Sequence, residues 1–105
     1  MSLAAQVLDI AKQRGVYIVT AESCTGGMIA AALTDIAGSS AVFDRGFVTY
    51  TNDAKREMLD VQSATLDAFG AVSEETAREM AIGALSNSNA QVALSVTGIA
   101  GPGGS

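Results

Sequence analysis

The sequence lacks histidine and tryptophan, and it has one proline and one cysteine, Cys24, among 105 residues. Without histidine, a Ser-His-Asp triad, a Cys-His pair and any zinc site with a histidine ligand are excluded. A single cysteine forms neither an internal disulfide nor a thiolate zinc site, and it is typical of a reducing cytosol. No cluster of acidic residues indicates a magnesium site. We therefore expect a cytoplasmic protein that uses no metal and no cofactor.

Basic residues are also few. Six Lys and Arg residues stand against eleven Asp and Glu residues, which gives a net charge of −5. The sequence has no basic cluster of the kind that a nucleic-acid backbone or an anionic membrane surface attracts. No apolar run approaches the ~18–20 residues of a membrane-spanning helix, and no secretory signal opens the chain. We therefore expect no nucleic-acid partner and no membrane association.

The chain is nevertheless apolar enough, at 49% hydrophobic residues, to bury the core of one domain. Hydrophobic periodicity and stop signals predict helices over 2–14, 27–36, 54–59 and 63–69, with a further helix that begins at 73. Apolar, β-branched segments predict strands over 16–20, 42–51 and 91–96. Strands that alternate with helices predict a single α/β domain over residues 1–105. We expect a mostly parallel or mixed sheet with helices packed on both faces.

Three loops follow the three predicted strands, namely Ala21–Gly27, Thr51–Lys55 and Thr97–Ser105. The carboxyl ends of parallel strands meet at one edge of a sheet, where ligands usually bind. The first loop ends in two glycines at the start of a helix, and such a start attracts anions. This loop is neither a Walker A nor a Rossmann motif, and a tight strand–helix turn with a hydroxyl cap is the alternative interpretation.

Ser23 in the first loop and Lys55 in the second could form a catalytic pair. A serine needs a base to become a nucleophile, and without histidine a neutral lysine is the natural substitute. An unperturbed lysine has a pKa near ~10.4, and lowering it by ~3 units costs about 4 kcal/mol. Burial, or the positive dipole of the helix start at Gly26 and Gly27, could supply this lowering. A solvated surface lysine is the alternative.

Several residues near these loops allow two interpretations each. Tyr50 could stack on a base or be a core or rim aromatic residue. Arg45 could pair with a substrate phosphate, or form a surface ion pair with a neighbouring aspartate, Asp44 or Asp35. Glu22 could orient a sugar hydroxyl or cap the turn.

Two further features are equally open. Cys24 lacks the usual base for a nucleophile, which favours a small buried hydrophobic residue. Backbone N–H groups of Thr97, Gly98 and the glycines that follow could form an oxyanion hole or hold a phosphate, and a flexible end is the alternative.

Five segments together resemble the CinA C-terminal domain family, which includes bacterial nicotinamide mononucleotide deamidases. These segments read TAESCTGG (20–27), DIAGSS (35–40), GFVTYTNDAK (46–55), GAVSEET (70–76) and TGIAGPGG (97–104). The resemblance implies an amidohydrolase that converts nicotinamide mononucleotide and water to nicotinate mononucleotide and ammonia without a metal. It implies Ser23 as nucleophile and Lys55 as base.

The resemblance carries further expectations. We expect substrate contacts from a set of residues in and beside the three loops, namely Glu22, Thr25, Gly26, Gly27, Arg45, Tyr50, Thr97 and Gly98. We also expect a homo-oligomer. Family domains continue past the glycine-rich loop with at least a strand and a helix, so we expect the native protein to extend beyond Ser105. The alternative function is a non-catalytic nucleotide-binding or regulatory module of the competence/damage type.

Overall fold

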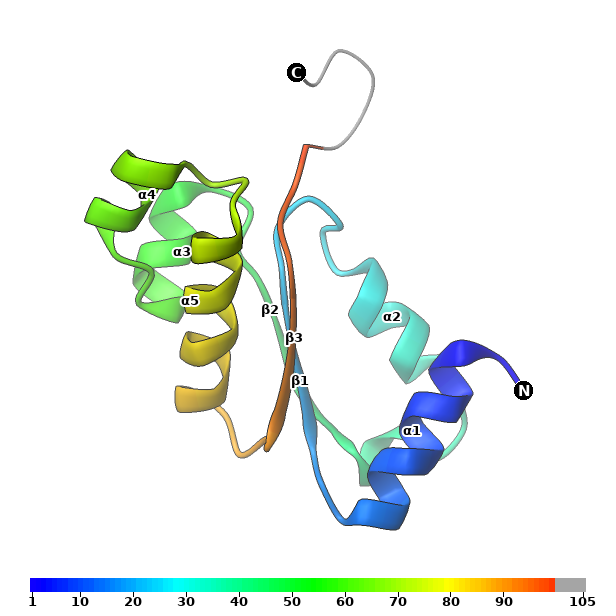
Figure 1. Cartoon of the computed structure of the whole chain (residues 1–105). Helices are drawn as coiled ribbons and strands as arrows, with labels where there is room; N and C mark the ends of the chain where they lie inside the picture. The colour runs from blue at the N-terminus through cyan, green and yellow to red at the C-terminus, as the bar shows by residue number, and fades with distance from the viewer. Residues whose placement is uncertain (100–105) are drawn as a thin grey trace.

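The computed structural model describes residues 1–99, which form helices and strands in alternation (Figure 1). The elements are α1 (Leu3–Arg14), β1 (Ile18–Glu22), α2 (Met28–Thr34), the 3-10 turn η1 (Ser39–Ala41), β2 (Phe43–Val48), α3 (Asn52–Leu59), α4 (Ser63–Phe69), α5 (Glu74–Ser86) and β3 (Val92–Val96). The α/β class predicted from the sequence is confirmed. Among these residues, no helix is long and apolar enough to cross a membrane.

The strands form one sheet in the order β2-β1-β3, and both outer strands run parallel to β1. Parallel pairing brings the carboxyl ends of all three strands to the same edge, at the top of Figure 1. The last register positions pair Glu22 with Val48 on one side and with Val96 on the other. The three predicted loops therefore leave the sheet at one edge, as expected for a ligand-binding edge.

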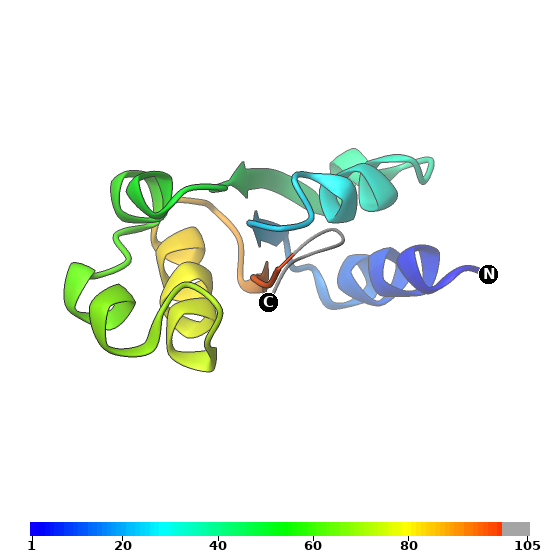
Figure 2. The ribbon, with the colours of Figure 1, turned by 90° about the horizontal axis from the view of Figure 1, so that it is seen from above.

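Helices cover both faces of the sheet. Seen from above, α1 and α2 lie on one side of the strands, and α3, α4 and α5 lie on the other (Figure 2). Side chains of β1 alternate between these layers, so that Val19 packs with Met80 of α5 while Ile18 packs with Leu8 of α1. Every residue of β1 is buried, including the polar Thr20 and Glu22, as expected for the central strand of a sheet that helices cover on both faces.

Several predicted boundaries move in the structure. β1 ends at Glu22 rather than at residue 20, so Ala21 and Glu22 of the predicted first loop lie in the strand, and α3 begins at Asn52 rather than at residue 54. β1 begins at Ile18 rather than at residue 16, because Gly15 ends α1 in the left-handed conformation and the chain needs two residues to reach the sheet. β2 ends at Val48 rather than at residue 51, because Thr51 is already the N-cap of α3. The Thr51 hydroxyl accepts a hydrogen bond from the backbone N–H of Ala54 at 3.0 Å.

Candidate active site

Ser23 and Lys55 meet at the carboxyl edge of the sheet. The Lys55 Nζ donates to Ser23 Oγ at 3.0 Å and to the carbonyl oxygen of Tyr50 at 3.2 Å. Ser23 Oγ lies 3.4 Å from the same carbonyl. The exposed fractions are only 6% for Ser23 and 2% for Lys55. A hydroxyl, an amine and one backbone carbonyl thus form a compact, nearly dry cluster.

Helix geometry explains why Lys55 reaches Ser23. Long side chains of a helix lean toward its amino terminus. Lys55 lies in the first turns of α3, so its amine points back to the segment that enters the helix and finds the carbonyl of Tyr50 there. Ser23 is held from the opposite direction, because its N–H donates to the carbonyl of Val96 at 2.9 Å.

Burial lowers the pKa of the Lys55 amine, and a nearby Cys24 thiolate would oppose the effect. Among residues 1–99, no carboxylate forms an ion pair with Lys55. Of the two causes expected from the sequence, burial and the dipole at Gly26 and Gly27, burial is the main one. Burial thus shifts the amine in the direction that a general base would require, toward the neutral form.

The pair opens into a cleft of about 280 Å³. Its lining combines the three loops with the segment between α4 and α5, and consists of Ser23, Cys24, Tyr50, Asn52, Lys55, Ala71, Thr97, Gly98 and Ile99. The sequence did not indicate Ala71, because its segment follows a helix rather than a strand and the strand-end rule gives no signal there. Asn52 and Ile99 lie within predicted loops but had not been singled out.

The third loop is tied to that additional segment. Thr97 Oγ1 donates to the carbonyl oxygen of Ala71 at 2.7 Å. A Cβ atom on Gly98 would lie 3.3 Å from Cys24 Sγ, so glycine leaves room for the thiol. Cys24 is half-buried beside the cleft rather than fully buried. The remainder of the predicted loop, 100–105, lies outside the described residues.

The start of α2 does not present the free donors expected of an anion site. The carboxylate of Glu22 accepts from the backbone N–H groups of Ile29 at 2.9 Å and Ala30 at 3.0 Å, and from Thr25 Oγ1 at 2.6 Å. Burial alone would raise the pKa of Glu22, but these hydrogen bonds outweigh it and lower the pKa. The protein's own carboxylate therefore occupies this helix start. Of the two interpretations of Glu22, the structure favours the cap.

Gly26 and Gly27 shape the turn instead of lining the cleft. Their φ angles are +60° and +109°, in the region that favours glycine. The Gly26 N–H donates to the carbonyl of Ser23 at 3.1 Å, which closes the turn. Within residues 1–99, no acceptor is found for the N–H groups of Cys24 and Gly98, two residues of the cleft.

The structure does not bring Arg45 to the cleft. Arg45 pairs with Val19 in the register of the sheet, away from the carboxyl edge. Its guanidinium forms an ion pair with Asp44 at 2.8 Å and donates to the carbonyl of Asn87 at 3.1 Å. The surface ion pair, which the sequence left open for Arg45, is the observed arrangement. Tyr50 remains at the cleft, where its 66% exposed side chain forms part of the rim.

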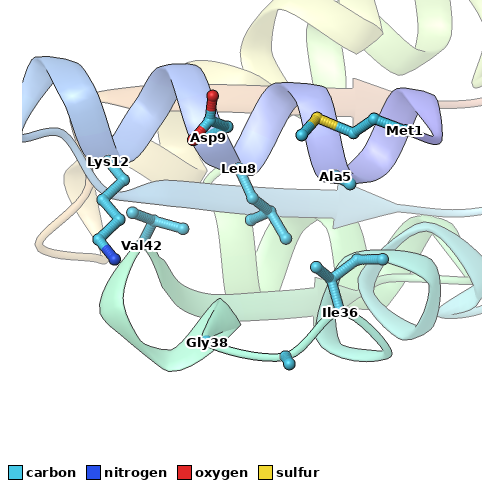
Figure 3. Close-up of a pocket in the computed structure, with 9 residues that line it drawn as sticks. Met1, Ala5, Leu8, Asp9, Lys12, Ile36, Gly38 and Val42 are labelled. Carbon is cyan, nitrogen blue, oxygen red and sulfur yellow. The ribbon is translucent and has the colours of Figure 1, made fainter.

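A second hollow lies between α1 and the segment after α2 (Figure 3). Leu8, Ile36 and Val42 form its apolar wall, and Asp9 and Lys12 are its charged members. It contains no serine, cysteine or threonine that could act as a nucleophile. The cleft at the carboxyl edge is therefore the better candidate for chemistry.

The chain is similar to known proteins in both sequence and structure. The family model described as the CinA C-terminal domain matches residues 1–105. The chain is 61% identical over 93 residues to the nicotinamide-nucleotide amidohydrolase PncC of Enterobacter agglomerans, covering 89% of this chain and 57% of that protein. It is 57% identical to the PncC of Escherichia coli K12, covering 99% of this chain and 63% of that protein. The chain thus spans about three fifths of the length of these amidohydrolases.

Longer relatives and solved structures also match. A CinA-like protein of Chloroherpeton thalassium is 58% identical over 99% of this chain, which covers 25% of that relative. The crystal structure of a competence/damage inducible protein from Agrobacterium tumefaciens superposes with a TM-score of 0.93 at 60% identity, covering 99% of this chain and 68% of that chain. The competence damage-inducible protein A of Klebsiella pneumoniae superposes with a TM-score of 0.95 at 45% identity, covering 98% and 64%.

Proposed function

This chain belongs to the CinA C-terminal domain family, and on that basis we propose that it deamidates nicotinamide mononucleotide to nicotinate mononucleotide and ammonia. In this proposal Ser23 is the nucleophile and Lys55 is the general base. The observation that carries it is the contact of 3.0 Å between a buried lysine amine and a buried serine hydroxyl. The identity to relatives named as nicotinamide-nucleotide amidohydrolases supports the choice of substrate.

The proposed reaction has two steps. Neutral Lys55 takes the proton of Ser23, and the serine oxygen attacks the carboxamide carbon of the substrate. The C–N bond then breaks, and Lys55 returns the proton to the departing ammonia. Water adds to the acyl-enzyme with Lys55 as base, which breaks the ester bond, releases the carboxylate product and restores the Ser23 hydroxyl.

We assign the oxyanion donors to the N–H groups of Cys24 and Gly98. Both residues line the cleft beside Ser23, and neither N–H donates to an acceptor within residues 1–99. A donor on the residue that follows the nucleophile is a common solution in serine hydrolases. Backbone donors fixed in this way stabilise the negative charge that develops on the carbonyl oxygen.

We assign substrate recognition to the rim of the cleft. The exposed ring of Tyr50 offers a flat apolar surface for the pyridine ring. We assign the phosphate to Thr97 and Gly98, since Glu22 already occupies the start of α2. Arg45 has no part in this proposal, because its guanidinium is engaged by Asp44 and Asn87.

The test measures ammonia release from nicotinamide mononucleotide by the wild type, Ser23→Ala and Lys55→Met. Both variants should lose turnover, whereas the surface controls Ser39→Ala and Lys12→Met should retain it. Removing a nucleophile or its base costs a factor on the order of 10² or more. Turnover at the wild-type rate in either Ser23→Ala or Lys55→Met would eliminate the Ser/Lys mechanism.

A second candidate function is nucleotide binding without catalysis, as part of a longer regulatory protein. It is favoured by the Chloroherpeton thalassium relative, whose name gives no enzymatic activity and of which this chain matches 25%. Calorimetric measurement of nicotinamide mononucleotide binding, together with the ammonia assay, distinguishes the two functions. Tight binding of nicotinamide mononucleotide with no ammonia released would support the binding module.

We further propose that the protein acts in the cytoplasm on a small-molecule nucleotide rather than on nucleic acid, and that it self-associates. The net charge of −5 and the single cysteine support the first part. The second part is supported by exposed apolar side chains along α1 and β3, at Val7, Ile10, Val92 and Leu94. Light scattering at several protein concentrations tests it, and a mass that stays at one chain would contradict it.

A further inference from the structure

Glu22 holds an unusual position beside the nucleophile. It is the last residue of β1 and directly precedes Ser23, and its side chain is only 1% exposed. Its carbonyl oxygen accepts from the N–H of Thr49 at 2.8 Å, which anchors the residue to β2. Its carboxylate, however, turns away from the cleft to the first turn of α2.

The carboxylate spans the whole turn that carries Ser23. One end of the turn is the backbone of Glu22 itself, and the other end is held through the N–H groups of Ile29 and Ala30. In the middle, the Thr25 hydroxyl donates to the same carboxylate at 2.6 Å. We call this arrangement of Glu22, Thr25, Ile29 and Ala30 the turn clasp. It closes the five-residue connection between β1 and α2, which contains two glycines in left-handed conformations.

We propose that Glu22 is a positioning residue, whose clasp with Thr25 holds the turn so that Ser23 Oγ stays within reach of the Lys55 amine. This inference rests on the proposed Ser/Lys mechanism. The clasp touches neither reacting atom. It acts through the backbone of the turn, which fixes the direction in which the Ser23 side chain leaves the sheet.

Geometry separates the clasp from the chemistry of the base. Side chains alternate along a strand, so Glu22 faces α2 while Ser23 faces the layer of α3 and α5. Thr25 lies outside the residues that line the cleft. A change in the clasp should therefore alter the placement of Ser23 and leave both the titration of Lys55 and the substrate surface as they are.

The test compares kcat, KM and the pH dependence of kcat in Glu22→Gln, Thr25→Val and Thr25→Ser. Glutamine replaces an acceptor oxygen by a donor, and valine removes the hydroxyl. Both should lower kcat by about tenfold to a hundredfold, since misplacement of a reacting group by about 1 Å has that effect. KM and the midpoint of the pH profile should stay at the wild-type values. Thr25→Ser restores the hydroxyl and should recover most of the kcat lost in Thr25→Val.

The chain offers a matched control. At the start of α4, the carboxylate of Glu79 accepts from the N–H of Gln62 at 2.8 Å and from the Thr65 hydroxyl. This is the same chemistry at a helix start far from Ser23 in the chain and outside the cleft lining. Glu79→Gln and Thr65→Val should lower the thermal midpoint as the clasp variants do, and should keep kcat.

Three outcomes would overturn the inference. The clasp variants could lose stability with kcat intact, which would make the clasp merely structural. They could raise KM at constant kcat, which would make Glu22 a substrate-binding residue. They could move the pH midpoint, which would indicate an electrostatic effect on Lys55. If Glu22→Gln does not fold, Thr25→Val against Thr25→Ser decides alone.

A second measurement tests the role of the clasp independently of the proposed substrate. A sulfonyl fluoride labels an activated serine, and intact mass reports the rate at Ser23 without any nucleotide. Should the wild type label at Ser23 but release no ammonia, the substrate assignment fails and the clasp is judged by labelling rates. Slower labelling in Thr25→Val, recovered in Thr25→Ser, would support it. Equal rates in all three proteins would overturn it.

Discussion

The amine of Lys55 lies 3.0 Å from the hydroxyl of Ser23, although 32 positions separate the two residues in the chain. One comes from the turn after the central strand, and the other from a helix that follows the neighbouring strand. Their contact therefore depends on parallel pairing of β1 with β2 and on the packing of α3 beside the sheet edge.

Activity should increase with pH through the lowered pKa of Lys55. Only the neutral amine accepts the Ser23 proton, so kcat should rise and then level off, with a midpoint below the ordinary lysine value of about 10.4. Lys55→Arg retains the charge but cannot lose its proton, and its kcat should fall by about 10²-fold or more at every pH. Steady-state kinetics from pH 6 to about 10 provide the profile. A wild-type profile that is flat across this range would contradict the role of Lys55.

Stability should change with pH in a manner that Lys55 determines. Because burial lowers the pKa of Lys55, the folded protein binds fewer protons than the unfolded chain between that lowered value and about 10.4. The free energy of unfolding should therefore rise with pH in this window, by at most about 1.4 kcal/mol per pH unit. Urea unfolding of wild type and Lys55→Met tests this. The rise should disappear in Lys55→Met and persist in Lys12→Met.

Loss of the α3 cap should weaken the helix that carries the base. Thr51→Ala removes the acceptor for the Ala54 N–H and should cost about 1 kcal/mol of unfolding free energy, with a smaller loss in Thr51→Ser. The midpoint of urea unfolding reports the change. Ser2→Ala is the control, since Ser2 caps α1 in the same way. Thr51→Ala should also reduce kcat, whereas equal kcat in both capping variants would show that the cap does not affect the site.

Close packing of α3 on α5 should make position 83 intolerant of a side chain. A Cβ atom on Gly83 would lie 1.9 Å from the carbonyl oxygen of Leu59, which is backbone and cannot rotate away. Gly83→Ala should therefore displace α3 and destabilise the fold by about 1–3 kcal/mol, despite the better helix propensity of alanine. Thermal unfolding measures it against Ser86→Ala, an exposed change in the same helix. A thermal midpoint of Gly83→Ala at or above that of the wild type would show that α3 and α5 can move apart without loss of stability.

Most of the fold could be predicted from the sequence because its signals are local. The apolar segment before Ala21 predicts a strand, and the helical spacing after Ser73 predicts a helix. The alternation of strands and helices along the chain then predicts the parallel sheet. The pair of Ser23 and Lys55 could be predicted because parallel strands bring their following loops to one edge. The absence of histidine then left Lys55 as the candidate base.

The remaining features depend on side-chain direction, which sequence position alone does not determine. Glu22 had two interpretations, and only its place at the end of β1, facing α2, decides for the cap. Arg45 lies in the strand that leads to the second loop, but in the sheet it pairs with Val19, away from the carboxyl edge where the cleft lies. Ala71 enters the cleft through the Thr97 hydroxyl bond, a contact across 26 positions.

The carbonyl oxygen of Tyr50, which both Lys55 and Ser23 approach, has a consequence for the divergence of this site. A main-chain atom is present whatever side chain stands at position 50. Exchange of the exposed ring at the rim would alter the surface that the cleft offers to a ligand and leave the main-chain oxygen beside Ser23 and Lys55 in place. In the proposed mechanism, substrate selection and alignment of the nucleophile would thus belong to separate parts of one residue.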